Sequence, residues 1–235
     1  MEVATLRSGE RVLDVGCGTG IVARLAAERV ALGGSVTGVD VNPGMLAVAR
    51  SVTASGIPIE YHEASAEAMP FPDESFDIAL CQMSLQFMTD RRGALAEMRR
   101  VLVPDRRVVI NPPGPASPFF EALADAMGRH ISPRAAGSVQ QVFSLYDLAE
   151  VRDLLGEAGF RDVRVDAQNK ELTLPPAKDF LWQYVYSTPL AAAVHDVDDA
   201  ALAALENEVV REWGDSTHEG GMKGGQHMVV ASGRK

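Results

Sequence analysis

A short apolar segment, Arg11–Val15, runs into alternating glycines at Gly16, Gly18 and Gly20, and a helix-like segment follows at Ile21–Val30. Glycine has no Cβ, so it lets the backbone turn with positive φ and approach a ligand closely. A strand, a tight glycine loop and a helix in this order predict a βα unit that holds a nucleotide-like ligand. The spacing G-x-G-x-G differs from the G-x-G-x-x-G of dinucleotide-binding loops, which seat a pyrophosphate at the helix N-terminus. The loop therefore favours a ligand without phosphates.

The first half of the chain continues this alternation. Further strands are predicted at Ser35–Val39, Ile59–His62, Phe76–Cys81 and Arg107–Asn111. Helices are predicted between them, one with Asn42 as N-cap and one over Arg91–Leu102. The buried face of the first of these is expected to hold Met45, Leu46, Ala49 and Val52. Strands that alternate with helices in this way predict an α/β fold with a parallel sheet.

After Pro112 the pattern changes, because prolines cluster up to Pro118 and amphipathic helices follow. Ser144 and Asp147 have the spacing of a capping box before a helix, and later strands are predicted at Phe160–Val165 and Gln226–Ser232. We predict a cofactor-binding α/β core and helical cap insertions. The core is expected over 1–112, 146–172 and 222–235, and the insertions over 113–145 and 173–221.

Charge and cysteine content narrow the function. The 235-residue chain has 22 Lys and Arg against 32 Asp and Glu, a net charge of −10, which disfavours binding to nucleic acid or an anionic membrane. Its only cysteines are Cys17 and Cys81, too few for a disulfide framework. There is no apolar run long enough for a membrane span, and Met1–Glu10 lacks the apolar region of a signal peptide. We expect a cytoplasmic protein that acts on a small molecule.

Several motifs in fixed order extend this interpretation. The glycine loop is followed by Val36–Asp40, Ala66–Phe71, Phe76–Ile78 and Glu97–Leu102. With these motifs the chain resembles class I S-adenosylmethionine-dependent methyltransferases of the ubiquinone/menaquinone-biosynthesis branch. The resemblance is clear over Arg11–Asn111 and looser over Phe143–Val165 and the last strand.

The resemblance implies a fold and an activity. The fold is a Rossmann-like sheet of seven strands, mainly parallel with the last strand antiparallel, with helices on both faces and a helical cap. The activity is in-line transfer of a methyl group from S-adenosylmethionine to an oxygen, nitrogen or carbon of a small, fairly apolar acceptor, releasing S-adenosylhomocysteine. Such chemistry is typical of small-molecule or secondary metabolism.

The resemblance also implies the cofactor contacts. Asp14 matches the acid that faces the methionine amino group, and Asp40 matches the acid that binds the ribose. The remaining implied contacts lie along the methionine, the adenine and the transferring methyl: Gly16, Cys17, Gly18, Val41, Met45, Ser65, Ala66, Glu67 and Gln82. Many relatives carry Asp where this chain has Ser65. They also carry helices before the first strand, which indicates a short or trimmed N-terminus here.

The acceptor side is less defined by the sequence. Gln86 lies where relatives often place a substrate-side residue. The aromatic segment that contains Trp182 and Tyr186 is either part of the core or an apolar wall of the substrate pocket. His130 and His195 are the candidates for a general base, and a surface or packing role is the alternative for each. No histidine or cysteine has metal-ligand spacing, so no metal site is expected.

Two alternatives remain at this stage. A nicotinamide-dependent oxidoreductase shares the order of strand, glycine loop, helix and acid, but its pyrophosphate spacing is missing here. A non-catalytic protein that binds S-adenosylmethionine would keep the fold without the chemistry. Because one fold serves many acceptors, the sequence leaves the acceptor open, together with the oligomeric state.

Overall fold

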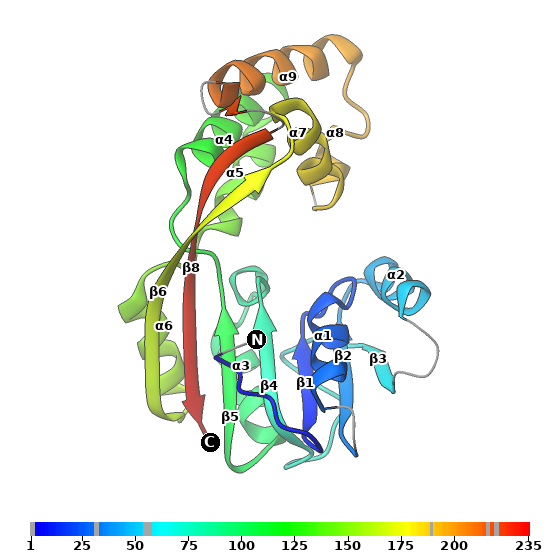
Figure 1. Ribbon diagram of the computed structural model, residues 1–235, viewed down its shortest axis with the longest axis vertical. Helices are drawn as coiled ribbons and strands as arrows, with labels where there is room; N and C mark the ends of the chain where they lie inside the picture. Colours follow the sequence, from blue (N-terminus) through cyan, green and yellow to red (C-terminus); the bar gives the residue numbers. More distant parts are fainter. Residues whose placement is uncertain (1–2, 31–32, 54–57, 189, 215–216, 219–220) are drawn as a thin grey trace. The chain divides into compact units, whose positions relative to one another are not determined.

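The computed structural model describes residues 3–30, 33–53, 58–188, 190–214, 217–218 and 221–235. Contacts within the chain divide it into two compact units. Unit 1 comprises residues 1–112, 145–167 and 229–235, and unit 2 comprises residues 113–144 and 168–228. Two long strands that are neighbours in the sheet, β6 (Arg161–Leu174) and β8 (Gly221–Arg234), contribute residues to both units (Figure 1).

Unit 1 is built from alternating strands and helices, as the sequence predicts. Its first strands are β1 (Arg11–Val15), β2 (Ser35–Asp40), β3 (Ile59–Glu63), β4 (Phe76–Gln82) and β5 (Leu102–Asn111). Its helices are α1 (Ile21–Val30), α2 (Pro43–Val52), the short 3₁₀ helix η1 (Leu85–Phe87), α3 (Arg91–Val101) and α6 (Leu148–Glu157). The expected α/β class is confirmed.

The strands form one mainly parallel sheet. Within the described residues its order is β3-β2-β1-β4-β5-β8-β6, with the two-residue β7 (Thr217–His218) paired to β8. The pairs β1/β2, β2/β3, β1/β4 and β4/β5 are parallel, and β8 is antiparallel to β5. The predicted reversal of the last strand is therefore confirmed. The strand order changes direction between β1 and β4, and the carboxyl ends of strands at such a point are where α/β sheets bind ligands.

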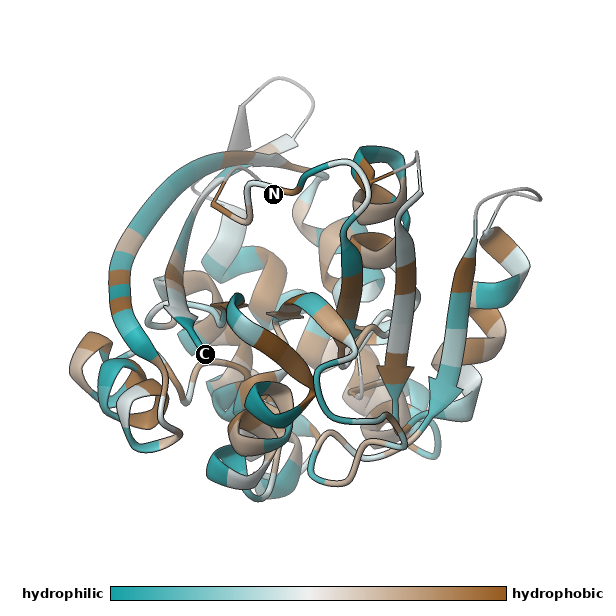
Figure 2. Cartoon of the chain, turned by 90° about the horizontal axis from the view of Figure 1, so that it is seen from below, coloured by the Kyte–Doolittle hydropathy of each residue, from teal (hydrophilic) through white to brown (hydrophobic). Residues whose placement is uncertain are grey.

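Alternating residues of the central strands pack against helices on the two faces of the sheet. On one face Val12, Ile78 and Val109 pack with the alanines of α1. On the other face the next residues along the same strands, among them Leu13 and Ala79, pack with α3 and α6. Figure 2 shows hydrophobic residues recurring along the central strands. Because the strands are covered on both faces, they read as nearly continuous apolar runs in the sequence.

Two details of the helices correct the sequence prediction. Asn42 caps α2 as expected, accepting from the amides of Gly44 and Met45 at 2.9 and 3.2 Å, but Val52 is 52% exposed and lies off the buried face. In α6 the N-cap is Asp147, which accepts from two backbone amides, and the predicted capping box that begins at Ser144 is wrong.

Unit 2 is largely helical. It contains α4 (Pro118–His130), α5 (Pro133–Val142), α7 (Ala177–Tyr186), α8 (Leu190–Val194) and α9 (Asp199–Gly214). Its core includes Leu123, Met127, Leu181, Val209 and Trp213, all fully buried. Among the described helices of the chain, none is long and apolar enough to span a membrane.

The last two long strands begin earlier or end later than predicted. β6 extends to Leu174 rather than Val165, and β8 begins at Gly221 rather than Gln226. Most of β6 is exposed on both faces, so its sequence lacks the alternation of apolar and polar residues that marks a half-buried strand. The pairing of the two strands determines their length instead.

Candidate active site

The glycine loop turns sharply after β1 and is attached to the end of β2. The amides of Gly16 and Cys17 both donate to the carbonyl of Val39, at 2.8 and 3.0 Å. Gly16, Gly18 and Gly20 have φ of +66°, +53° and +76°, a region that residues with a Cβ avoid. The alternating glycines are therefore required by the backbone path of the loop.

The glycines of the loop face different surroundings. A Cβ at Gly16 would lie 1.7 Å from Oγ of Ser84, and a Cβ at Gly20 would lie 2.4 Å from the hydroxyl of Tyr61. Apart from its chain neighbours, no atom of the described residues would lie within 4 Å of a Cβ at Gly18. Gly16 and Gly20 are thus packing positions, whereas Gly18 borders open space where a ligand can approach the backbone.

Asp40 ends β2 and is hydrogen-bonded to the loop. Its Oδ2 accepts from the amide of Gly18 at 2.8 Å and its Oδ1 accepts from the amide of Asn42 at 2.8 Å. The side chain is partly exposed, and an ionised carboxylate has about four acceptor positions. The carboxylate therefore holds the loop and keeps acceptor capacity for a pair of ligand hydroxyls.

Asp14, in β1, is buried and only partly satisfied. Its side chain is 1% exposed, and its Oδ2 has no hydrogen-bond partner among the described contacts. The pKa of this carboxyl is raised to about 7: burial is the main cause, the nearby Asp40 adds to the shift, and a hydrogen bond from the amide of Ala23 opposes it. An unpartnered buried carboxylate is costly, so this oxygen is suited to a ligand cation.

The raised pKa of Asp14 leads to a prediction for stability. Its ordinary pKa of 3.8 applies in the unfolded chain, so between about pH 4 and about pH 7 the folded protein keeps a proton that the unfolded chain loses. The contribution of Asp14 is fully present below the lower pKa and is lost as pH rises through about 7, by roughly a few kcal/mol. We expect Asp14→Asn, which lacks this titration, to be more stable than wild type at about pH 8 and nearly equal at about pH 4.

Urea unfolding of both ligand-free proteins across this range measures the difference. Parallel curves of stability against pH for wild type and Asp14→Asn would show that Asp14 does not titrate in this way. Asp147→Asn is a matched control, because Asp147 also accepts from backbone amides but is exposed. Its replacement should leave the slope between about pH 4 and pH 7 as steep as in wild type.

The adenine-side candidates lie on the segments after β2 and β3. Val41 is 66% exposed and Met45 is partly buried at the start of α2. Oγ of Ser65 accepts from the amide of Glu67 at 3.1 Å, and Glu67 in turn accepts from the amide of Asp90 at 2.8 Å. Ser65 thus shapes its own turn, and Glu67 connects this turn to the start of α3. Ala66 packs against the core of unit 1.

Two candidates, one at the end of β4 and one just after it, differ strongly in burial. Gln82 is the last residue of β4 and is exposed. Gln86, in η1, is 1% exposed, and neither polar atom of its amide has a partner among the described contacts. Buried amides are normally hydrogen-bonded, so Gln86 is suited to a polar group that the protein itself does not supply.

The cysteines of unit 1 are unreactive by environment. Burial raises the pKa of the Cys17 thiol far above its ordinary value, and burial raises that of Cys81 to about 12. Both thiols stay protonated near neutral pH and are poor nucleophiles. Among the described residues, no group of three His, Cys, Asp or Glu side chains is placed to hold a metal ion.

The remaining candidates lie in unit 2. Nε2 of His130 contacts Oε2 of Glu208 at 2.6 Å, and the largely exposed His195 contacts Asp196 through Nδ1 at 2.7 Å. In α7, Nε1 of Trp182 donates to Glu206 at 2.7 Å. The Trp182 indole stacks on Tyr186 with ring centres 5.7 Å apart, and Tyr186 is 63% exposed. None of these contacts identifies a general base or a residue that binds the methyl acceptor.

Two residues at the site were missed by sequence reasoning. Ser84 packs against Gly16, and Tyr61 packs over Gly20 and Gly38. Both contacts join segments far apart in the sequence. The single signal available was Gly38 in the middle of a predicted strand, since a glycine there often marks a close approach.

Comparison with known proteins places this site in context. A family model described as "Methyltransferase domain" matches residues 13–110. The ubiquinone/menaquinone biosynthesis C-methyltransferase UbiE of Xanthomonas axonopodis pv. citri is 36% identical over 172 residues, covering 67% of this chain and 68% of that protein. The protein of the same name from Pectobacterium atrosepticum is 33% identical over 178 residues, covering 69% and 71%.

Solved structures are similar in fold. A putative methyltransferase from Bacillus halodurans has a TM-score of 0.66 and 19% identity, covering 100% of this chain and 96% of its own. Phosphoethanolamine N-methyltransferase 2 of Haemonchus contortus, solved in complex with S-adenosyl-L-methionine, has a TM-score of 0.58 and 22% identity, covering 97% and 49%.

Proposed function

This chain belongs to the class I S-adenosylmethionine-dependent methyltransferases, and on that premise we propose that it methylates a small-molecule acceptor by in-line displacement. S-adenosylmethionine is its cofactor and S-adenosylhomocysteine the product. When bound, the cofactor supplies a methyl group on a sulfonium, a donor that needs no further activation. We further propose that the acceptor is fairly apolar and is methylated on oxygen, nitrogen or carbon.

The observation that supports this proposal is the pair of carboxylates at the carboxyl ends of β1 and β2. Asp14 is buried, and one of its oxygens has no hydrogen-bond partner within the described residues, which suits an ammonium group. Asp40 is partly exposed beside Gly18, which suits a ribose diol. The open space at Gly18 lies next to Asp40, so the backbone there does not obstruct a ligand. An amino acid joined to a nucleoside meets both demands, as the implied cofactor does.

The proposed site residues divide among the parts of the cofactor. Asp14 would hold the amino group of the cofactor and thereby orient its methionine part. Asp40 would fix the ribose, while Gly16, Cys17 and Gly18 would line the chain between the two. Val41, Met45, Ser65, Ala66 and Glu67 are proposed around the adenine, and Gln82 near the methyl group.

Much of the rate of such a reaction can come from alignment. Holding the nucleophile and the methyl group in line in a site that excludes water removes the entropy cost of bringing them together. Gln86 is proposed as a substrate-side residue, because the polar atoms of its buried amide have no partners in the part of the chain that the structure describes. Trp182 and Tyr186 stay proposed substrate contacts. His130 and His195 stay proposed general bases, each already paired with a carboxylate.

Calorimetric titration with S-adenosylhomocysteine, with NADH in a parallel cell, tests the proposed site. We expect binding of S-adenosylhomocysteine in the micromolar range and none of NADH. The affinity should rise as pH increases through about 7, because Asp14 must ionise to pair with the ligand amine. Binding that is equally tight in Asp14→Asn at every pH would contradict the placement of the amino group.

The methyl transfer itself is tested by release of S-adenosylhomocysteine from S-adenosylmethionine in the presence of a set of candidate acceptors. We expect release that depends on a small, fairly apolar acceptor. Release only with a protein or nucleic acid acceptor would overturn the proposed substrate class while leaving cofactor binding intact.

A further inference from the structure

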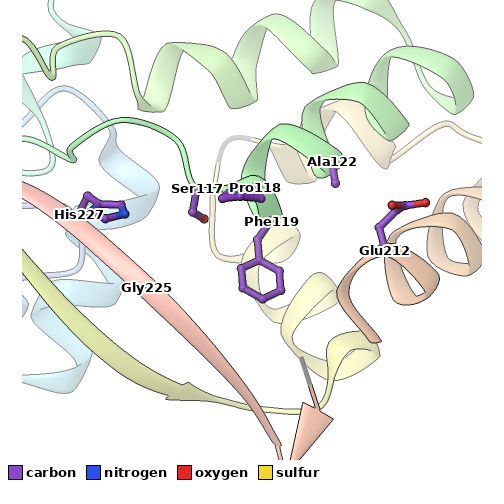
Figure 3. Close-up of a pocket in the computed structure, with 7 residues that line it drawn as sticks. All are labelled: Ser117, Pro118, Phe119, Ala122, Glu212, Gly225 and His227. Carbon is purple, nitrogen blue, oxygen red and sulfur yellow. The ribbon is translucent and has the colours of Figure 1, made fainter. Parts of the chain in front are cut away.

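Unit 2 contains a cavity of about 350 Å³ that the methyl transfer proposed above does not use. It lies between the start of α4, the end of α9 and the middle of β8 (Figure 3). Its lining residues all belong to unit 2 and are Ser117, Pro118, Phe119, Ala122, Glu212, Gly225 and His227. The volume lies at the small end of the range for small-molecule sites, so it suits a ligand of about one ring.

One end of the cavity offers a buried hydroxyl without a partner. Ser117 is the N-cap of α4, but its side chain makes no capping hydrogen bond. It is 7% exposed, and Oγ has no partner among the described contacts. A buried hydroxyl in this condition costs free energy unless a ligand supplies the missing hydrogen bond.

The same end offers an oriented imidazole. Nδ1 of His227 lies 2.6 Å from Oδ1 of Asn169, and an amide oxygen can only accept, so Nδ1 is the donor. In the neutral ring Nε2 is then an acceptor. The backbone of His227 is held by the amide of Gly114, which donates to its carbonyl at 2.7 Å. Ser117 and His227 together can donate to and accept from one ligand hydroxyl.

The other end of the cavity is anionic. Glu212 projects from α9; its Oε1 forms an ion pair with Arg211 at 3.0 Å in the described part of the chain, and Arg129 also interacts with this carboxylate electrostatically. Arg211 is 73% exposed, and exposed ion pairs are weak, so a ligand cation can share this carboxylate. The positive end of the α4 dipole lies at the opposite, hydroxyl-binding end, which disfavours a cation there.

An apolar wall separates the two polar ends. The ring of Phe119 lies between them in Figure 3, beside Pro118 and Ala122. Phe119 is fixed by Trp213, whose ring centre lies 5.8 Å away and whose Nε1 donates to the Phe119 carbonyl at 2.9 Å. The wall is therefore rigid and can pack against a flat apolar ligand.

We propose that this cavity binds a small amine with a single-ring apolar body and a hydroxyl group at the far end. The ammonium group contacts Glu212, the ring packs on Phe119, and the hydroxyl bonds to Ser117 and His227. The net charge of −10 favours approach of a cation. The site stands on contacts within unit 2 and does not depend on the methyl transfer proposed above.

Calorimetry with three related probes tests the proposal. Tyramine has both polar groups, phenethylamine lacks the hydroxyl, and para-ethylphenol lacks the amine. We expect tyramine to bind best, and each missing group to weaken binding by about 10-fold, which corresponds to about 1.4 kcal/mol. Equal affinity for all three probes, or no binding of tyramine, would overturn the proposal.

Variants assign each preference to its end of the cavity. In Ser117→Ala/His227→Leu, which removes both partners of the hydroxyl, the preference for tyramine over phenethylamine should disappear while the preference over para-ethylphenol remains. In Glu212→Gln the preference for tyramine over para-ethylphenol should disappear while the preference over phenethylamine remains. Asp199→Asn, on the same helix but outside the cavity, should behave as wild type. A variant at one end that abolishes both preferences, or neither, would contradict the proposed orientation.

A substitution that fills the cavity tests the site without changing its polar groups. Among the described residues other than its chain neighbours, a Cβ at Gly225 would meet only Nε2 of His227, at 4.0 Å, so Gly225→Leu can place its side chain in the cavity. It should block tyramine while S-adenosylhomocysteine still binds to unit 1. Tyramine binding unchanged in Gly225→Leu would overturn the site. If the wild-type protein does not bind S-adenosylhomocysteine, that result overturns the proposed function and leaves the proposed amine site standing.

Discussion

Asp40→Ala is expected to weaken the binding of S-adenosylhomocysteine by at least about 100-fold. In the proposed site the carboxylate forms two charge-assisted hydrogen bonds to the ribose, worth roughly 1.5 to 3 kcal/mol each. The substitution also releases the amides of Gly18 and Asn42, which the two oxygens of Asp40 now hold at 2.8 Å each. Both effects act on the same loop, and both weaken binding of the ligand. Calorimetric titration measures the loss directly.

A matched control separates the ribose contact from the backbone contacts. Asp147 also accepts from two backbone amides at the start of a helix in unit 1, at 2.7 and 3.0 Å. Asp147→Ala should lower stability by about 1 kcal/mol and leave the affinity for S-adenosylhomocysteine unchanged. If Asp40→Ala bound the ligand as tightly as wild type, the ribose would have to lie elsewhere.

Gly16→Ala is expected to abolish the binding of S-adenosylhomocysteine and to destabilise the protein. The new Cβ would lie 1.7 Å from Oγ and 2.6 Å from Cβ of Ser84, and the residue would keep a φ of +66°. The hydroxyl can rotate away, but the Cβ of Ser84 cannot move without its backbone. We expect the loop to shift, S-adenosylhomocysteine binding to be lost, and stability to fall by more than the roughly 1 to 2 kcal/mol of left-handed strain alone.

Gly33→Ala is the control for strain without a clash. Gly33 has a φ of +79°, and within the part of the chain that the structure describes a Cβ added there would meet no atom within 4 Å beyond its chain neighbours, so its substitution should cost about 1 to 2 kcal/mol and leave binding intact. The double variant Gly16→Ala/Ser84→Gly should recover part of the lost stability. Equal losses in Gly16→Ala and Gly33→Ala would show that the contact with Ser84 does not matter.

The α/β fold was predictable because its signals are local. Strands buried on both faces appear as short apolar runs, and glycines that need positive φ mark the loop after β1. Asn42 followed by Pro43 marked the start of α2. Where several caps compete, the outcome was less predictable, as Asp147 rather than Ser144 caps α6.

The long strands β6 and β8 were only partly predictable. Their predicted segments, Phe160–Val165 and Gln226–Ser232, are the more apolar parts of each strand. Polar residues such as those from Asp166 to Glu171 are held in β6 by hydrogen bonding to a neighbouring strand. Backbone pairing of this kind does not depend on side-chain pattern, so the sequence carries little trace of it.

The succession of strands and helices along the chain, the glycine loop after β1 and the acid at the end of β2 can all be predicted from the amino-acid sequence. Three features emerge only in the folded chain: the burial of Asp14 with an oxygen that has no partner among the described residues, the contact of Ser84 with Gly16, and the shared cavity of Ser117 and His227. The difference lies in the range of the interactions. Backbone conformation and apolar periodicity depend on near neighbours in the chain, whereas burial, electrostatic environment and cavity shape depend on segments that folding brings together.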